Sequence, residues 1–158
     1  SLGQVSVVVD LAHNEAGLEA LLEIMNGVRR PGARLLLGLG AVGDRTDDLV
    51  EHLGEMGARD ADVVAIAHKQ KYLRGRETDE LDALFRAGAH RVGVEDVPAH
   101  ATEVEGLAAL VEQARPGDVV GLMCHEDRQG VYDWLAENGF VADTPETLRD
   151  KVRAAQQP

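Results

Sequence analysis

The stretch VSVVVDLAHNEAG, residues 5–17, joins an apolar run to a polar turn and then to the start of a helical pattern. Its run at residues 5–10 is rich in β-branched residues and almost continuously apolar, which is typical of a strand buried on both faces of a parallel sheet. Asn14 has the side chain of a helix N-cap, and apolar residues at helical spacing follow it. The segment therefore predicts a strand, a tight turn and a helix, the repeating unit of an α/β domain.

Four further apolar runs repeat this unit along the chain. They lie at residues 33–39, 63–67, 91–94 and 119–123, and the five runs start 28 to 30 residues apart, the length of one strand–helix unit. Residues 140–141 suit a short edge strand, and a terminal helix is expected from a Thr144 cap to about Ala155. The pattern predicts a single α/β domain over residues 1–158. Its expected architecture is a three-layer Rossmann-like fold, with a mostly parallel sheet of five to six strands flanked by helices.

The composition narrows the classes of partner. The 158 residues carry 16 Lys and Arg against 28 Asp and Glu, a net charge of −12, whereas nucleic acids and anionic membranes select basic surfaces. The single cysteine, Cys124, excludes an intrachain disulfide, suits a buried inert thiol and fits a reducing compartment. No apolar run approaches the ~20 residues of a membrane span. We expect a cytoplasmic protein with no nucleic-acid or membrane partner and, since no Met opens the sequence, a piece of a longer chain.

Polar residues gather where the first strand is expected to end. Ligands of open α/β sheets bind beyond the carboxyl ends of the strands, so the residues that follow each strand are the informative ones. Asp10, His13 and Asn14 precede a helix N-terminus, whose N–H groups and dipole suit a phosphate or carboxylate. Two interpretations stand side by side: a ligand site, or an Asn14 cap with Asp10 fastening the loop.

The second strand is followed by a glycine motif. GLGAVG at residues 38–43 matches the G-x-G-x-x-G dinucleotide fingerprint, but it follows the second strand, and the next helix is expected near Thr46. The end of the following strand also lacks the acid that would bind a ribose hydroxyl. A dinucleotide site is therefore the weaker interpretation. Arg45, beside Asp44, either forms an internal ion pair or faces a ligand.

A basic segment and a short His-containing motif follow two later strands. Residues 69–76 contain Lys69, Arg74 and Arg76, and an arginine fork binds carboxylate or phosphate in a bidentate manner. The alternative is a solvated loop that pairs with nearby acids. CHED at residues 124–127 includes His125, but adjacent residues do not converge easily on one ion, so no zinc site is expected.

Four segments in order carry a family resemblance: DLAHNEAG (10–17), GDRTDD (43–48), LRGR (73–76) and CHE (124–126). The first resembles the D-x-A-H-N-P motif that opens the C-terminal domain of Mur ligases and their relatives, with Glu15 where the family usually has Pro. The second and third resemble segments of cyanophycin-synthetase-like proteins, and the fourth resembles the end of a late strand in peptidoglycan ligases. Folylpolyglutamate synthase belongs to the same superfamily. The resemblance covers nearly the whole chain.

The resemblance implies a division of labour within a longer ligase. In this family a central domain carries the phosphate loop that holds ATP and Mg²⁺, and the C-terminal domain closes over it. An acyl-acceptor carboxylate becomes an acyl phosphate, which the amine of an amino acid attacks. ATP, these two substrates and the upstream domains of the parent chain are therefore the implied partners. By position, the residues expected to face the nucleotide are Asp10, His13, Asn14 and Arg45, and those expected to face the amino acid or acyl substrate are Lys69, Arg74, Arg76 and His125.

The chain itself has no G-x-x-x-x-G-K-[ST] phosphate loop, no G-x-S-x-G elbow and no paired-cysteine motif. We therefore expect no catalytic residue and no metal site in this chain alone. Synthesis of cell wall, folate polyglutamate or a storage polymer would each suit the resemblance. Two other classes stay open, a stand-alone nucleotide- or dinucleotide-binding Rossmann module and a non-enzymatic interaction domain.

Overall fold

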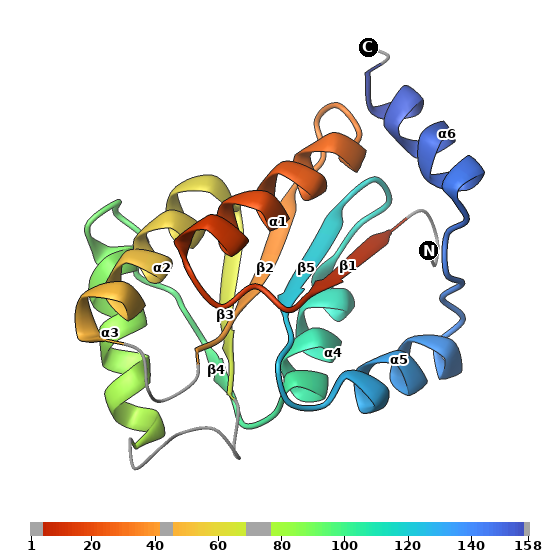
Figure 1. Cartoon of the computed structure of the whole chain (residues 1–158). Coiled ribbons are helices and arrows are strands. Elements are labelled where there is room, and N and C mark those ends of the chain that lie inside the picture. Colours follow the sequence, from red (N-terminus) through yellow and green to blue (C-terminus); the bar gives the residue numbers. More distant parts are fainter. Residues whose placement is uncertain (1–4, 42–45, 69–76, 157–158) are drawn as a thin grey trace.

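The computed structural model describes residues 5–41, 46–68 and 77–156, in which five strands alternate with helices (Figure 1). The strands are β1 (Ser6–Asp10), β2 (Leu35–Leu39), β3 (Val63–Ala67), β4 (Ala99–His100) and β5 (Val119–Met123). The helices are α1 (Glu15–Val28), α2 (Asp47–Asp60), α3 (Thr78–His90), α4 (Glu103–Gln113), α5 (Arg128–Glu137) and α6 (Pro145–Ala155).

The strands form one parallel sheet in the order β1-β5-β2-β3-β4. The last strand in sequence, β5, therefore lies between the first two. One apolar cluster joins the sheet to α1, α2 and α3, and a second cluster joins the opposite face to α4 and α5 (Figure 1). The three-layer, parallel α/β fold predicted from the spacing of the apolar runs is confirmed.

Strand β2 shows why the strands have continuous apolar sequences. Leu35, Leu37 and Leu39 belong to the cluster beneath α1, α2 and α3, whereas Leu36 belongs to the cluster beneath α4 and α5. Successive strand residues point to opposite faces of a sheet, and here helices cover both faces. All five residues of β2 are buried. Each large aliphatic side chain so buried contributes about 1.5–3 kcal/mol to folding.

Helices α2 and α3 approach each other closely at two glycines. A Cβ atom on Gly88 of α3 would overlap with the carbonyl oxygen of Glu51 in α2. A Cβ atom on Gly54 of α2 would overlap in the same way with the carbonyl oxygen of Phe85 in α3. The two backbones are therefore in direct contact, and any larger residue at either glycine would force the helices apart.

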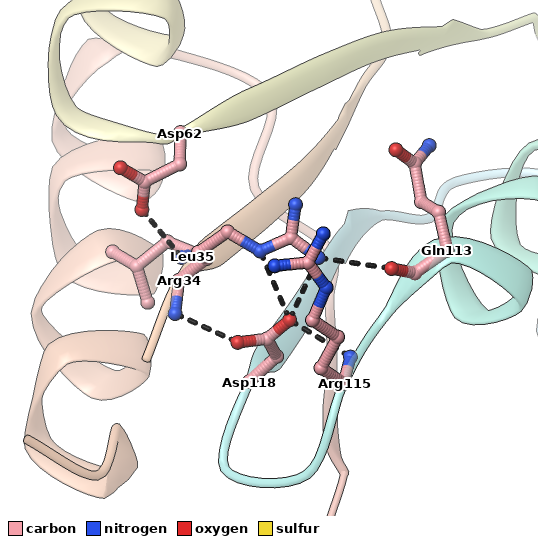
Figure 2. Close-up of polar contacts among 6 residues, drawn as sticks. All are labelled: Arg34, Leu35, Asp62, Gln113, Arg115 and Asp118. Atoms are coloured by element: carbon pink, nitrogen blue, oxygen red, sulfur yellow. Dashed lines mark hydrogen bonds and ion pairs between the residues drawn. The ribbon is translucent and has the colours of Figure 1, made fainter. Parts of the chain in front are cut away.

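Two carboxylates tie together the amino ends of β2, β3 and β5 (Figure 2). Asp118, before β5, accepts hydrogen bonds from the backbone N–H groups of Arg34 (2.8 Å) and Arg115 (2.9 Å), and it pairs with the Arg34 guanidinium at 3.0 Å. Asp62, before β3, accepts the N–H of Leu35 at 2.8 Å. Burial alone would raise the pKa of Asp118, but these donors outweigh it and hold that pKa below its ordinary value.

The fourth strand begins later than the sequence predicts. The strand expected at residues 91–94 is wrong, because these residues form the turn that ends α3. Gly93 has a left-handed φ of +83°, and the Val94 N–H donates to the Ala89 carbonyl at 3.1 Å. Pairing with β3 begins only at the carbonyl of Pro98, and the two residues of β4 follow.

The edge strand expected at residues 140–141 is also wrong, because no strand forms in this described segment. The Phe140 N–H donates to the Leu135 carbonyl at 2.9 Å and so closes the end of α5. Val141 is 75% exposed. The terminal helix is confirmed as α6, and Thr144 is its N-cap as the sequence predicts.

Candidate functional site

The strand order creates a topological switch point at the carboxyl ends of β1 and β5. These strands are neighbours, yet α1 leaves β1 over one face of the sheet and α5 leaves β5 over the other. The Cys124 N–H donates to the Asp10 carbonyl at 2.8 Å, so the turn after β1 and the loop after β5 start side by side. Ligands of open parallel sheets bind in the crevice at such points, which makes this edge the candidate site.

The turn between β1 and α1 carries polar side chains at this edge. Asp10 is half-buried, and His13 and Asn14 are exposed. The Asn14 Oδ1 accepts the Gly17 N–H at 2.9 Å, which confirms Asn14 as the N-cap of α1. The His13 Nδ1 lies 3.2 Å from the carbonyl oxygen of Leu11. The cap fixes the turn and leaves an imidazole at the open end of the sheet.

His125 brings the loop after β5 against this turn. It is half-buried, and its Nε2 is within hydrogen-bond distance of the Ala12 carbonyl oxygen. The ring centroids of His125 and His13 lie 6.4 Å apart, with the planes 78° from each other. The family resemblance implies that His13 faces the nucleotide and His125 the other substrate. The structure brings the two imidazoles into one corner of the edge.

A buried carboxylate from α4 holds the same loop. Glu103 is only 2% exposed, and its oxygens accept the backbone N–H groups of His125 (2.7 Å) and Asp127 (2.8 Å). The Glu126 N–H reaches both oxygens, at 3.1 and 3.3 Å, and the Cys124 thiol donates at 3.2 Å. Cys124 is buried, as the sequence predicts. Glu103 therefore binds four consecutive residues of the loop, 124–127.

Another carboxylate, that of Asp82, contacts the imidazole of His68 at the end of β3. His68 is buried, and its Nε2 lies 2.6 Å from the Oδ1 of Asp82 in α3. The His68 N–H donates to the His100 carbonyl at 3.1 Å, at the end of β4. These contacts fix the strand end from which the basic segment at residues 69–76 continues in sequence.

Four of the predicted site residues lie outside the described residues: Arg45, Lys69, Arg74 and Arg76. Their roles stay predictions. Of the glycine motif at residues 38–43, Gly38 lies inside β2, where a Cβ would be 2.8 Å from a Leu122 methyl carbon. Gly38 therefore permits close packing within the sheet layer, whereas the first glycine of a dinucleotide fingerprint forms a turn.

The described residues were also compared with the requirements of a metal site and of a membrane-spanning helix. Within residues 5–41, 46–68 and 77–156, no three His, Cys, Asp or Glu side chains come together in a way that could hold a metal ion. None of the helices in those ranges is both long and apolar enough to cross a membrane.

Sequence reasoning missed Glu103 and Asp82. Glu103 follows the cap residue Thr102, so in sequence it looks like an ordinary acid in the first turn of a helix. Asp82 lies on a helix rich in charged residues. Each side chain acts on a strand end that is distant in sequence, and no local pattern contains that information.

Comparisons with known proteins identify the family of the chain. A family model described as Mur ligase, glutamate ligase domain, matches residues 1–124. Two curated relatives are each named UDP-N-acetylmuramoyl-L-alanyl-D-glutamate--2,6-diaminopimelate ligase. The Corynebacterium efficiens protein is 29% identical over 154 residues, which is 94% of this chain and 28% of the relative. The Chlorobium phaeobacteroides protein is 26% identical over 148 residues, 92% of this chain and 27% of the relative. The chain thus spans just over a quarter of the length of these relatives.

A solved structure shares the fold. It is a domain of a Haemophilus ducreyi protein described as a UDP-N-acetylmuramate:L-alanyl-gamma-D-glutamyl-medo-diaminopimelate ligase. The TM-score is 0.55 at 20% identity, over 86% of this chain and 92% of that domain. The family model matches more than three quarters of the chain. The chain therefore belongs to the Mur ligase family, as a glutamate ligase domain.

Proposed function

We propose that this chain is the C-terminal domain of an ATP-dependent amide ligase, and that its carboxyl edge closes over a nucleotide held by the upstream part of the same protein. The observation that carries the proposal is the meeting of His13 and His125 at the switch point between β1 and β5. Two loops there offer side chains to a ligand, while the chain has no phosphate loop of its own. Such an edge suits a domain that completes a site formed with another domain.

ATP would supply the phosphoryl group that activates a carboxylate, and Mg²⁺ would neutralise the charge of its phosphates. We assign Asp10, His13 and Asn14 to the nucleotide side of the cleft, together with Arg45. A carboxylate such as Asp10 fits a Mg²⁺ ion that keeps several waters, because this ion is commonly bound through one or two carboxylates. The described residues hold no three-ligand group, so we place the remaining metal ligands in the upstream domain.

The substrate side of the cleft is assigned to Lys69, Arg74, Arg76 and His125. An arginine side chain presents a planar fork that matches a carboxylate, and a lysine ammonium adds a mobile positive charge. In a chain of net charge −12, such a cluster would draw an anionic substrate to this edge. Closure would bring these donors onto the developing charge and exclude the water that hydrolyses an acyl phosphate.

The test uses the full-length protein that carries this domain, with ¹⁸O in the acceptor carboxylate. Attack of the carboxylate on the terminal phosphate of ATP releases ADP, and attack of the amine then releases inorganic phosphate. We expect one ¹⁸O atom in phosphate for each amide formed. Amide formation with unlabelled phosphate, or with AMP and pyrophosphate as products, would contradict the acyl-phosphate route.

A further inference from the structure

The carboxylate of Glu103 fills an anion-binding concavity made by the protein itself. The backbone N–H groups of His125, Glu126 and Asp127 are consecutive, and all three donate to its oxygens at 2.7 to 3.3 Å. Successive N–H groups that converge in this way form a nest, which in other proteins receives a phosphate or another anion. Here the occupant comes from the first residue of α4 and is buried.

The start of α4 does not need a buried acid at position 103. Thr102 already caps the helix, since its Oγ1 accepts the Glu105 N–H at 3.1 Å. Glu105 is exposed in the same first turn and supplies negative charge near the helix N-terminus. A buried carboxylate carries a desolvation cost that only its hydrogen-bond donors offset. The structural consequence specific to Glu103 is therefore the fixed conformation of the loop after β5.

That loop carries side chains of the candidate site. His125 extends from it to the Ala12 carbonyl oxygen and lies against the ring of His13. Glu126 follows directly and is half-buried. Because the same nest bonds set the backbone of both residues, a change in the nest would redirect both side chains without removing either one.

We infer that Glu103 is a positioning residue of the ligase site: by filling the nest, it holds His125, which is assigned above to the substrate side of the cleft, against Ala12 and His13. The inference rests on the proposed function for the assignment of His125 to that side. It also implies that the N–H groups at residues 125–127 are unavailable to substrate phosphate. The anionic groups of the substrates would then be bound by side chains.

The first arm of the test uses the 158-residue chain and NMR. Glu103→Gln keeps the shape but removes the charge and turns an NH₂ group toward the donors of the nest. We expect faster hydrogen exchange at the amides of residues 125–127 and loss of the NOE between the rings of His13 and His125. Glu105→Gln removes one charge from the same turn and should change neither. Unchanged exchange and an unchanged ring NOE in folded Glu103→Gln would overturn the inference.

The second arm measures kinetics in the full-length enzyme. For Glu103→Gln we expect KM for the amino acid to rise about tenfold, as for the misplacement of one charged contact, with KM for ATP within about threefold of wild type. Glu105→Gln should match wild type. An unchanged KM for the amino acid would show that the loop does not position this substrate. Equal increases in both KM values would indicate general damage to the domain, and either result rejects the proposal.

Two features keep the test decisive. If Glu103→Gln does not fold, Glu103→Asp retains the charge with a side chain one methylene shorter, and the same two KM values apply to it. If the wild-type enzyme forms no ADP with any amino acid, the proposed function fails. The NMR arm would still report whether Glu103 orients His125, so the two failures are distinguishable.

Discussion

The Nη2 atom of Arg34 lies 3.0 Å from the Oδ2 atom of Asp118, although the two residues are 84 positions apart in the chain. Their ion pair (Figure 2) sits at the amino ends of β2 and β5. The edge where His13 and His125 meet lies at the opposite, carboxyl ends of the strands. The Asp118 carboxylate thus joins strands at one end of the sheet, and the exposed polar turn that contains His13 lies at the other end. Substitutions at the two ends should therefore have different consequences.

Asp118→Asn should destabilise the domain at neutral pH. The hydrogen bonds that lower the Asp118 pKa stabilise the folded state above the unfolded pKa of about 3.9, and this contribution is lost as the pH falls through the lower folded pKa. We expect the free energy of unfolding to fall by about 2 kcal/mol at pH 7. The difference from wild type should narrow below about pH 4. Urea denaturation at several pH values measures both effects.

The matched control is Asp150→Asn. Asp150 pairs with Arg153 on α6, and both side chains are more than half exposed, so the substitution should cost no more than about 0.5 kcal/mol. A loss at Asp118 that stays constant from pH 7 to pH 2 would contradict the role given to its ionised carboxylate.

Two glycine substitutions should change stability in opposite directions. Gly88→Ala places a methyl group against the Glu51 carbonyl oxygen and should destabilise the domain by about 1–3 kcal/mol. Gly27 lies in α1 with no neighbouring atom within 4 Å of its Cβ position, so Gly27→Ala should stabilise the helix by roughly 0.5–1 kcal/mol. Thermal unfolding of both variants is the measurement. Equal stability of Gly88→Ala and wild type would disprove the close contact of α2 and α3.

His13→Ala should reduce turnover of the full-length enzyme far more than it reduces stability. His13 is exposed, and the Asn14 cap, which the substitution leaves in place, already fixes the turn. Loss of a donor that acts in the transition state lowers kcat about 10²–10³-fold. His90→Ala, at the exposed end of α3, is the control. Normal kcat in a His13→Ala variant of reduced stability would instead assign His13 a structural role.

Much of the fold could be predicted from the sequence because the strands are buried on both faces. Continuous apolar runs such as residues 35–39, repeated at the spacing of a strand–helix unit, are typical of a covered parallel sheet. The strand expected at residues 91–94 failed because Gly93 ends α3 there, and a β-branched composition cannot distinguish a turn from a strand. The insertion of β5 between β1 and β2 depends on long-range packing, which no local pattern records.

The candidate site could be predicted only in part for a similar reason. The Asn14 cap is a local interaction and was predicted correctly. The contact between His13 and His125 joins residues 112 positions apart, and the role of Glu103 requires the helix α4 to lie beneath the loop after β5. Such contacts follow from the strand order, so sequence reasoning identified the residues at each strand end but not which of them meet.

Arg74→Lys and Arg76→Lys should each raise KM for the anionic substrate in the full-length enzyme, with KM for ATP changed less. A lysine keeps the charge but cannot reproduce the planar fork that binds a carboxylate in a bidentate manner. Arg59→Lys is the control, because Arg59 is exposed and pairs with its neighbour Asp60. Michaelis curves with each substrate varied in turn provide the readout. Unchanged KM for both the amino acid and the acyl acceptor would assign residues 69–76 to solvent.

The most direct test compares ADP formation by the full-length protein and by residues 1–158 alone. The account predicts that the full-length protein sustains ADP formation over many turnovers only with both an amino acid and an acyl acceptor present, because the acyl phosphate must react with the amine before the next turnover. The isolated chain should show no ATP turnover above background and an affinity for ATP no better than about millimolar, near −4 kcal/mol. Calorimetry and an ADP release assay measure both quantities. Micromolar ATP binding or measurable hydrolysis by residues 1–158 alone would contradict the claim that this domain closes a nucleotide site held by another part of the protein.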